Sequence, residues 1–179
     1  MDKISTERIR LLHPLLGERL VQLAYLLSLE GVDIRVVQGG RTWKEQDVLY
    51  AKGRTVPPIG KKFAVTNAKG GESWHNYFMA ADVAPDDPDI LGWQPDWHPD
   101  HPSWKRIVEV GTDNGLVSGV SFHDLPHLQL TGRFPVSPTD EVRQLFRDGG
   151  IQAVWQESGL PLAEAGDHLH PAQINLRGL

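Results

Sequence analysis

Residues 73–84 read SWHNYFMAADVA and place a histidine and an aspartate next to a run of small apolar side chains. The run from Met79 to Ala84 is short, apolar and free of Gly and Pro, which predicts a buried strand. His75 precedes the strand, and Asp82 lies inside it, seven residues after the histidine. The segment therefore predicts a polar pair held at a buried strand.

A second polar segment, DLPH, spans residues 124–127. Residues 125–130 (LPHLQL) are expected to form the last strand, and Pro126 indicates an edge strand or a bulge. Asp124 lies three residues before His127. This spacing brings both side chains together at the start of the strand if the chain bends as it enters the strand. The two segments together supply two imidazoles and two carboxylates.

These residue types suit a zinc site. The chain has no cysteine and eight histidines, so a transition-metal site must use His and carboxylate ligands. Catalytic zinc takes three protein ligands and leaves one position open, and a nearby unbound carboxylate can accept a proton from water. The spacing alone leaves a second interpretation open: hydrogen-bonded half-buried histidines, with Asp82 as a strand-end cap and Asp124 as a turn former.

The segments before this pair predict a helix, a strand and a second helix. Four leucines at spacings of four, three and four predict a helix from about residue 14 to residue 29, with Pro14 in its first turn and Gly31 ending it; they are Leu16, Leu20, Leu23 and Leu27. Residues 33–37 (DIRVV) are expected to form a strand. A capping box at Thr42 and Glu45 opens a helix that runs to about Ala51.

The remaining segments complete an α+β pattern. Residues 54–72 predict a long loop with a short strand at 63–66, and residues 85–102 are irregular. Ser103 is expected to cap a helix with Trp104 and Ile107 on one face, and residues 113–115 form a turn. Helices are expected from Pro138, at the first helical position, to about residue 147, and over residues 151–157. We expect a single domain over residues 1–179, built from helices packed on a small antiparallel sheet with a metal site in a cleft at the sheet.

Net charge and the length of the apolar stretches argue against two classes of partner, nucleic acid and membrane. The 179 residues carry a net charge of −5, and the sequence pI is near 5.9, which argues against a nucleic-acid binder with a basic stripe. Charges interrupt every apolar stretch well before 18 residues, so we expect no membrane span. The N-terminus MDKISTERIR has no apolar core of a signal peptide, so we expect synthesis in the cytoplasm without export by the general pathway.

Several motifs in order resemble the zinc D-Ala-D-Ala carboxypeptidase and L-alanyl-D-glutamate endopeptidase family. The family pattern contains Ser-x-His-x6-Asp and a later Asp/Glu-x-x-His, which stand here at 73–82 and 124–127. The flanking stretches GGRTWKEQDVLYAKGR (39–54), VTNAKGGESWHNY (65–77) and NGLVSGVSFHDLPHLQL (114–130) also match. The resemblance covers roughly residues 9–131 and leaves residues 132–179 as a helical C-terminal extension and tail.

The resemblance implies a role for each matched residue. It gives the zinc ligands as His75, Asp82 and His127. Asp124 corresponds to the general base and Arg41 to the cation that steadies the substrate and the developing oxyanion. Ser73 corresponds to a substrate contact, and Gln46 to a substrate or supporting contact, with a plain helix-face polar group as the alternative for Gln46.

The chain departs from the family pattern in two places. Phe78 stands where the family usually has Gly, so we expect either ordinary backbone angles there or a strained loop that reshapes the pocket wall. The tryptophan-glycine element before the second motif is reduced to Val117-Ser118-Gly119. Both changes bear on substrate preference more than on metal binding.

Other polar and aromatic clusters offer weaker alternatives. His98 and His101 are a rival metal pair or part of a substrate rim, although solvated surface is the simpler interpretation. His123 adjoins the site, but its side chain is expected to point away in extended chain. The remaining candidates are a partial calcium loop at Asp86, Asp87 and Asp89, surface histidines at His168 and His170, and groove-lining tryptophans at Trp93, Trp97 and Trp104.

The expected function is zinc-dependent hydrolysis of an amide bond in peptidoglycan stem peptides, between L-Ala and D-Glu. We expect a monomeric endolysin that acts on the cell wall after release, with neither nucleic acid nor membrane as a partner. Two alternatives stay open: a D-Ala-D-Ala carboxypeptidase on the same scaffold, and a non-catalytic zinc-bearing module that binds cell wall.

Overall fold

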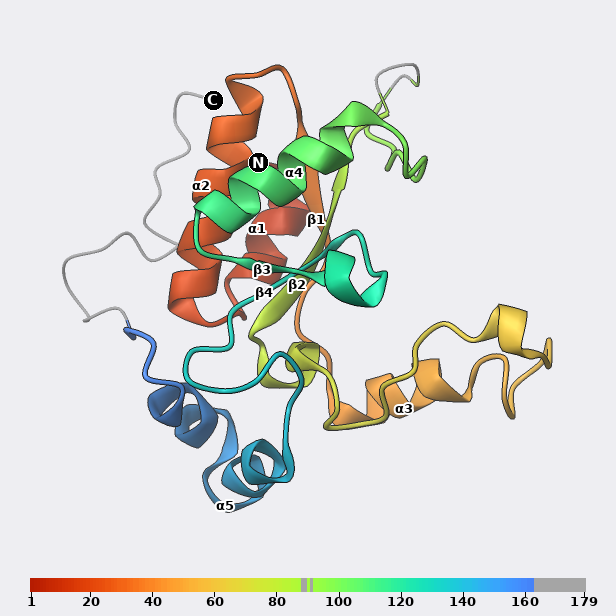
Figure 1. Ribbon diagram of the computed structural model, residues 1–179, viewed down its shortest axis with the longest axis vertical. Helices are drawn as coiled ribbons and strands as arrows, with labels where there is room; N and C mark the ends of the chain where they lie inside the picture. The colour runs from red at the N-terminus through yellow and green to blue at the C-terminus, as the bar shows by residue number, and fades with distance from the viewer. Residues whose placement is uncertain (88–89, 91, 163–179) are drawn as a thin grey trace.

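The apolar run after His75 forms an inner strand of a four-stranded antiparallel sheet, whose strand order is β1-β2-β4-β3 (Figure 1). The structure is a computed structural model that describes residues 1–87, 90 and 92–162. Its strands are β1 (Ile34–Gln38), β2 (Ala80–Pro85), β3 (Val117–Ser118) and β4 (His127–Gln129). Its α-helices are α1 (Lys3–Ile9), α2 (Pro14–Ser28), α3 (Trp43–Ala51), α4 (Pro102–Asp113) and α5 (Asp140–Glu157). Three 3-10 turns join them, namely η1 (Lys61–Phe63), η2 (Trp74–Tyr77) and η3 (Gly119–Phe122), and the expected α+β fold is confirmed.

The register of the two inner strands puts polar and apolar side chains on opposite faces. Asp82 of β2 is the direct cross-strand partner of His127 of β4. The neighbouring residues Ala81, Val83 and Leu128 belong to the apolar core that also contains α2 and α4. Because successive side chains of a strand alternate between faces, Asp82 and His127 point away from that core.

The helical layer follows the predicted leucine stripe. Leu16, Leu20, Leu23 and Leu27 of α2 are each 0% exposed. Helix α1 was not predicted; it begins where the Asp2 carboxylate accepts hydrogen bonds from the backbone of Ile4 and Ser5. A carboxylate in that position satisfies N–H groups that the first turn leaves without partners.

The C-terminal part packs on the turn that carries His75. The helix interruption expected between 147 and 151 is present as a kink in α5 at Gly150, which has φ 66° and ψ −159°. Trp155 donates its indole N–H to the carbonyl of Tyr77, and Trp74 donates to the carbonyl of Val136. Residues 134–155 thus brace η2 from outside, with Trp74 and Tyr77 in a second apolar cluster.

Four local expectations are wrong. Strand β4 is an inner strand rather than an edge, and Pro126 precedes it, so no ladder N–H is lost. Residues 63–66 form no strand, since no neighbouring strand pairs with them. His101, not Ser103, caps α4, and helix α5 begins at Asp140, which leaves Pro138 outside it.

Among the described residues, no helix is long and apolar enough to cross a membrane.

His13 is a fully buried histidine at the start of α2. Its Nδ1 accepts from the backbone N–H of Leu15, while its Nε2 lies buried without a hydrogen-bond partner among the described residues. The ring meets that of Trp155 edge-on at 5.1 Å. Burial lowers the pKa of His13 to about 4, so the folded protein keeps this ring neutral.

We predict that His13 makes the protein lose stability in mild acid. Its pKa is lower folded than unfolded, so the unfolded chain takes up the proton first and stability falls from about pH 6.5 toward pH 4. Between pH 7 and pH 5 this group alone removes about 2 kcal/mol. Urea unfolding at both pH values should show that loss in the wild type and a smaller one in His13→Asn, which keeps the cap. Equal losses in the two proteins would contradict the prediction.

Candidate metal centre

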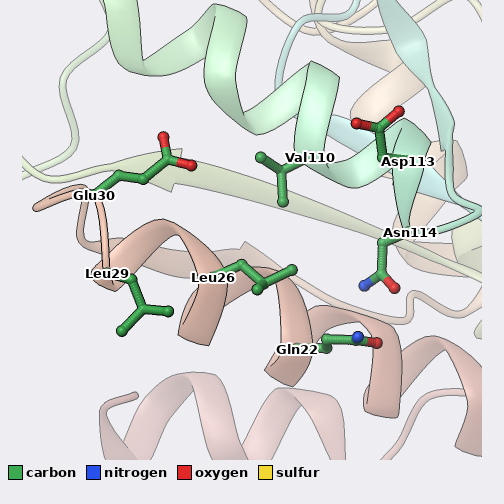
Figure 2. A pocket seen from close by; sticks show the side chains of 7 residues that line it. All are labelled: Gln22, Leu26, Leu29, Glu30, Val110, Asp113 and Asn114. Atoms are coloured by element: carbon green, nitrogen blue, oxygen red, sulfur yellow. The ribbon is translucent and has the colours of Figure 1, made fainter.

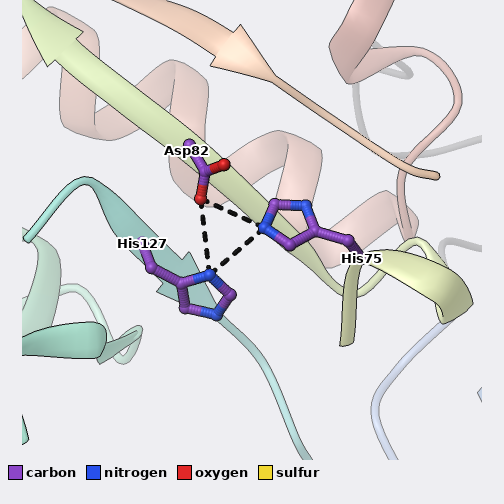
Figure 3. Close-up of side chains that lie close together, drawn as sticks. All are labelled: His75, Asp82 and His127. Atoms are coloured by element: carbon purple, nitrogen blue, oxygen red, sulfur yellow. Dashed lines mark hydrogen bonds and ion pairs between the residues drawn. The ribbon is translucent and has the colours of Figure 1, made fainter. Parts of the chain in front are cut away.

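Three potential ligand atoms converge beside the sheet. His75 comes from η2, Asp82 from β2 and His127 from β4 (Figure 3). His75 Nε2 lies 3.1 Å from Asp82 Oδ1 and 3.2 Å from His127 Nδ1. The third distance, from His127 Nδ1 to Asp82 Oδ1, is 3.4 Å. They are the one group of three or more such residues in the described part of the chain that is suited to hold a metal ion.

The spacing of these atoms fits a tetrahedral ion. Ligands about 2.0–2.1 Å from a tetrahedral zinc lie about 3.3 Å from one another, close to the three observed separations. The donors, two imidazoles and one carboxylate, are also a set typical of catalytic zinc. The sequence motifs therefore lead to a triangle of the right chemistry and size.

The far nitrogens of both imidazoles have fixed partners. His75 Nδ1 lies 2.7 Å from the carbonyl oxygen of Gly39, and His127 Nε2 lies 2.7 Å from Oε1 of Gln129. Gln129 is oriented in turn because its Nε2 donates to the carbonyl of Val136. Since both partners are acceptors, each ring carries its proton there and turns a lone pair toward Asp82. Lone pairs facing a carboxylate are favourable when a cation lies between them.

The electrostatics keep Asp82 ionised. Burial alone would raise its pKa, but the neighbouring His75 and His127 lower that pKa well below the usual range of an aspartate. Burial likewise opposes protonation of His127, whereas the neighbouring carboxylate of Asp82 raises the pKa of this histidine. A permanent carboxylate is what a cation site requires.

Asp124 lies beside the triangle but outside it. Its Oδ2 is 3.9 Å from His127 Nδ1, and its side chain is 50% exposed. A short turn, in which His127 donates its backbone N–H to the carbonyl of Asp124, sets this approach. Burial of the carboxyl and the negative charge of Asp82 raise the pKa of Asp124, so it binds a proton more readily than an ordinary aspartate.

Arg41 reaches the same cluster from the loop after β1. Its Nη2 lies 3.4 Å from Asp82 Oδ2, and its Nη1 donates to Oε1 of Gln46 at 3.1 Å. Gln46 is 1% exposed and donates its own Nε2 to the carbonyl of Ala68. Gln46 therefore holds Arg41 from behind, and its buried amide has no open face for a substrate.

Ser73 lies at the start of η2. Its hydroxyl oxygen caps the turn by accepting from the backbone N–H of His75 at 3.4 Å. The backbone of the same histidine is also tied to the loop after β1, since Arg41 donates its N–H to the carbonyl of His75. The local fold thus positions His75 at both its backbone and its ring.

Of the two backbone conformations expected at Phe78, ordinary or strained, the structure has the strained one. Its φ of 57° and ψ of 29° are left-handed, where side chains other than Gly are uncommon. The ring occupies the space above Gly40: a Cβ at Gly40 would lie 2.1 Å from Phe78 Cδ1. The Phe78 ring therefore fits only because residue 40 is a glycine.

The rival clusters do not form a comparable centre. His101 accepts from the backbone of Ser103 and faces Asp96 at 3.6 Å, which makes it a helix cap. His123 is exposed at the end of η3. Trp97 stacks on Trp104, while Arg35 lies over the ring of Trp93. Asp86 accepts a backbone N–H from Gln94, and Asp89, His168 and His170 lie outside the described residues.

A hollow of about 410 Å³ lies elsewhere, between α2 and α4 (Figure 2). Its lining residues are Gln22, Leu26, Leu29, Glu30, Val110, Asp113 and Asn114. This hollow is in the helical layer, whereas Asp82 and His127 point away from the core beneath that layer. The candidate metal centre therefore rests on the chemistry and spacing of its side chains and not on the hollow.

The chain is similar to known proteins in sequence and in structure. No family model matches it. The peptidoglycan L-alanyl-D-glutamate endopeptidase CwlK of Bacillus subtilis (strain 168) is 34% identical over 126 residues, which cover 66% of this chain and 73% of that protein. The crystal structure of the L-Ala D-Glu endopeptidase ChiX of Serratia marcescens matches with a TM-score of 0.48 and 23% identity, over 84% of this chain and 92% of that chain.

We predict that Gly40 and Phe78 are energetically coupled. Gly40→Ala should destabilise the wild type by about 1–3 kcal/mol, because the new methyl group overlaps the ring. In the Phe78→Gly background the same change should cost at least about 1 kcal/mol less. Urea unfolding of the four proteins measures this difference, and an additive result would refute the steric account.

We also predict that Gln129 tunes metal affinity. Gln129→Leu removes the acceptor that holds His127 Nε2, and such supporting hydrogen bonds are typically worth about 10–100-fold in metal affinity. Competition with a chromophoric chelator should show the loss for Zn²⁺. Gln152→Leu, a matched change at an exposed position of α5, should leave the affinity unchanged. Equal affinities in both variants would exclude this role for Gln129.

Proposed function

Because the chain belongs to the family of the peptidoglycan L-alanyl-D-glutamate endopeptidases, we propose that it hydrolyses the amide bond between L-Ala and D-Glu in peptidoglycan stem peptides. One observation of the structure supports this most directly. His75, Asp82 and His127 converge at tetrahedral spacing, with the unbound carboxylate of Asp124 beside them. This is the arrangement that metal-assisted amide hydrolysis needs.

We propose zinc as the metal, held by His75, Asp82 and His127. Two neutral imidazoles and one carboxylate leave the ion a residual positive charge. A zinc ion so held would polarise the scissile carbonyl and lower the pKa of water toward about 7. Gly39 and Gln129 hold the far nitrogen of each ring and so aim the other nitrogen at the ion.

Asp124 is the proposed general base. Its carboxylate accepts a proton from the attacking water and then delivers that proton to the leaving amine of D-Glu. The shift of its pKa toward neutrality favours both halves of this transfer, because a good base at working pH must also give the proton back. Its exposed side chain leaves room for the substrate.

Arg41 is the proposed electrostatic partner of the substrate oxygen. Its side chain lies beside Asp82 and is 14% exposed, so it is not closed off from a substrate. Gln46 positions the guanidinium and Asp82 balances its charge, which pre-organises the donor before the substrate arrives. Ser73, at the start of η2, is proposed to contact the substrate backbone.

The bond that is cut can be read from the products. Purified peptidoglycan should yield fragments with a new N-terminal D-Glu, detected by mass spectrometry, and wall suspensions should clear if the enzyme acts lytically. Release of free D-Ala would identify a D-Ala-D-Ala carboxypeptidase instead. Stoichiometric zinc with no cleavage would identify a binding module.

Asp124→Asn should separate catalysis from metal binding. The amide cannot accept the proton, so the rate of wall cleavage should fall by about 10²–10⁴-fold. Zinc content measured by metal analysis should stay at the wild-type level, because Asp124 lies outside the ligand triangle. His75→Ala, the matched ligand variant, should lose zinc and cleavage together. Full activity in Asp124→Asn would exclude Asp124 as the base.

A further inference from the structure

Residues 52–69 carry a charge opposite to that of the rest of the chain. This segment, the basic arm, holds five of the 18 Lys and Arg residues and none of the 23 Asp and Glu residues. Its cations are Lys52, Arg54, Lys61, Lys62 and Lys69. The arm follows α3 and extends away from the body of the molecule, on the side opposite α2 (Figure 1). A projecting segment with one sign of charge is a surface that attracts anions.

The lysines of the arm are available for binding. Lys52, Lys61, Lys62 and Lys69 are all exposed, and none of them forms an ion pair within the described part of the chain. Only aromatic rings lie against two of them: Lys62 over the ring of Phe63, and Lys69 over that of Tyr50. These charges are not used to hold the fold together.

The base of the arm is tied down. Arg54 stacks 3.9 Å over the ring of Tyr50 and donates to the carbonyls of Tyr50 and Thr66, which joins the outgoing chain to the returning chain. Asp47 of α3 accepts the backbone N–H of Gly70. These contacts fix the base of the arm against α3.

The arm also displays apolar side chains that cover no core. Val56, Ile59, Phe63 and Val65 are between 39% and 58% exposed. Exposed apolar groups between cations suit a partner that combines carboxylates with methyl groups, as a peptide rich in Ala and Glu does.

The arm is connected to the metal centre through one buried side chain. Gln46 donates to the carbonyl of Ala68 in the arm and accepts from Arg41, whose other nitrogen faces Asp82. Gln46 therefore links the returning end of the arm to the arginine that faces Asp82, which places the arm next to the metal centre.

We propose that the basic arm is a docking surface for peptidoglycan, which binds the free carboxylates of stem peptides next to the one being cut. This inference rests on the proposed function, because the polymer is the proposed substrate. D-Glu has two carboxyl groups and needs only one for chain linkage, so the polymer is anionic. The remainder of the chain mixes 13 Lys and Arg residues with all 23 Asp and Glu residues, whereas the arm offers cations alone to such a polymer.

The test is a binding measurement that does not depend on cleavage. The metal-loaded full chain is mixed on ice with sacculi stripped of secondary wall polymers, and the bound fraction is measured after pelleting. Lys61→Glu with Lys62→Glu should lower the affinity about tenfold at low ionic strength, and the difference should vanish in high salt. Kinetics on a short soluble stem peptide should be unchanged.

A matched variant controls for net charge. Lys3 and Lys105 are 89% and 81% exposed, on α1 and α4, and the double change to Glu gives the same net charge as the arm variant. This control should keep wild-type affinity for sacculi. Equal losses in both variants, or no loss in either, would overturn the docking surface.

Two further outcomes would also overturn it. The first is wild-type protein that binds unstripped sacculi but not stripped ones, which would assign the arm to a secondary polymer. The second is an arm variant that keeps its affinity for sacculi but loses binding to vesicles of phosphatidylglycerol, which would assign the arm to membrane lipid. A protein that binds through the arm yet cuts no L-Ala–D-Glu bond would contradict the proposed function and leave the docking surface intact.

Discussion

The pairing of Asp82 with His127 across β2 and β4 is the constraint on which the candidate metal centre depends. Side chains alternate along a strand, so a slip of one residue would turn either group into the apolar core. The register is held from that core side, where Ala81, Val83 and Leu128 pack with the helices. The sheet thus supplies two of the three proposed ligands in fixed relation, and only His75 must be brought from another element.

His75 is brought in by a turn that is held on several sides. The loop after β1 binds its ring and its backbone, through the carbonyl of Gly39 and the N–H of Arg41. The C-terminal segment binds the same turn from outside, through Trp155 and the carbonyl of Val136. Residues beyond the motif-bearing region therefore contribute to the site, because they hold the short 3-10 turn η2 in place.

Local chemistry made much of this predictable from the sequence. The capping box at Thr42 and the leucine stripe of α2 act through near neighbours, and both appear as expected. Two features were missed, one set by a neighbour in the same strand and one by a contact distant in sequence. Gln129 supports His127 only because the two share a face of β4, a contact that follows once the strand is recognised. Nothing in the local sequence around Gly40 indicates that its missing side chain accommodates Phe78 in place of the usual glycine.

The net charge of the chain is likewise a poor guide to how its surface meets an anionic polymer. A net charge of −5 argues against adhesion to an anionic wall only if the charge is evenly spread. Electrostatic attraction is screened over about 8 Å at physiological ionic strength, so a polymer at the surface senses the nearest side chains and not the sum. Residues 52–69 hold cations without acids, while the acids stand elsewhere. An acidic protein can therefore present a basic surface to an anionic polymer.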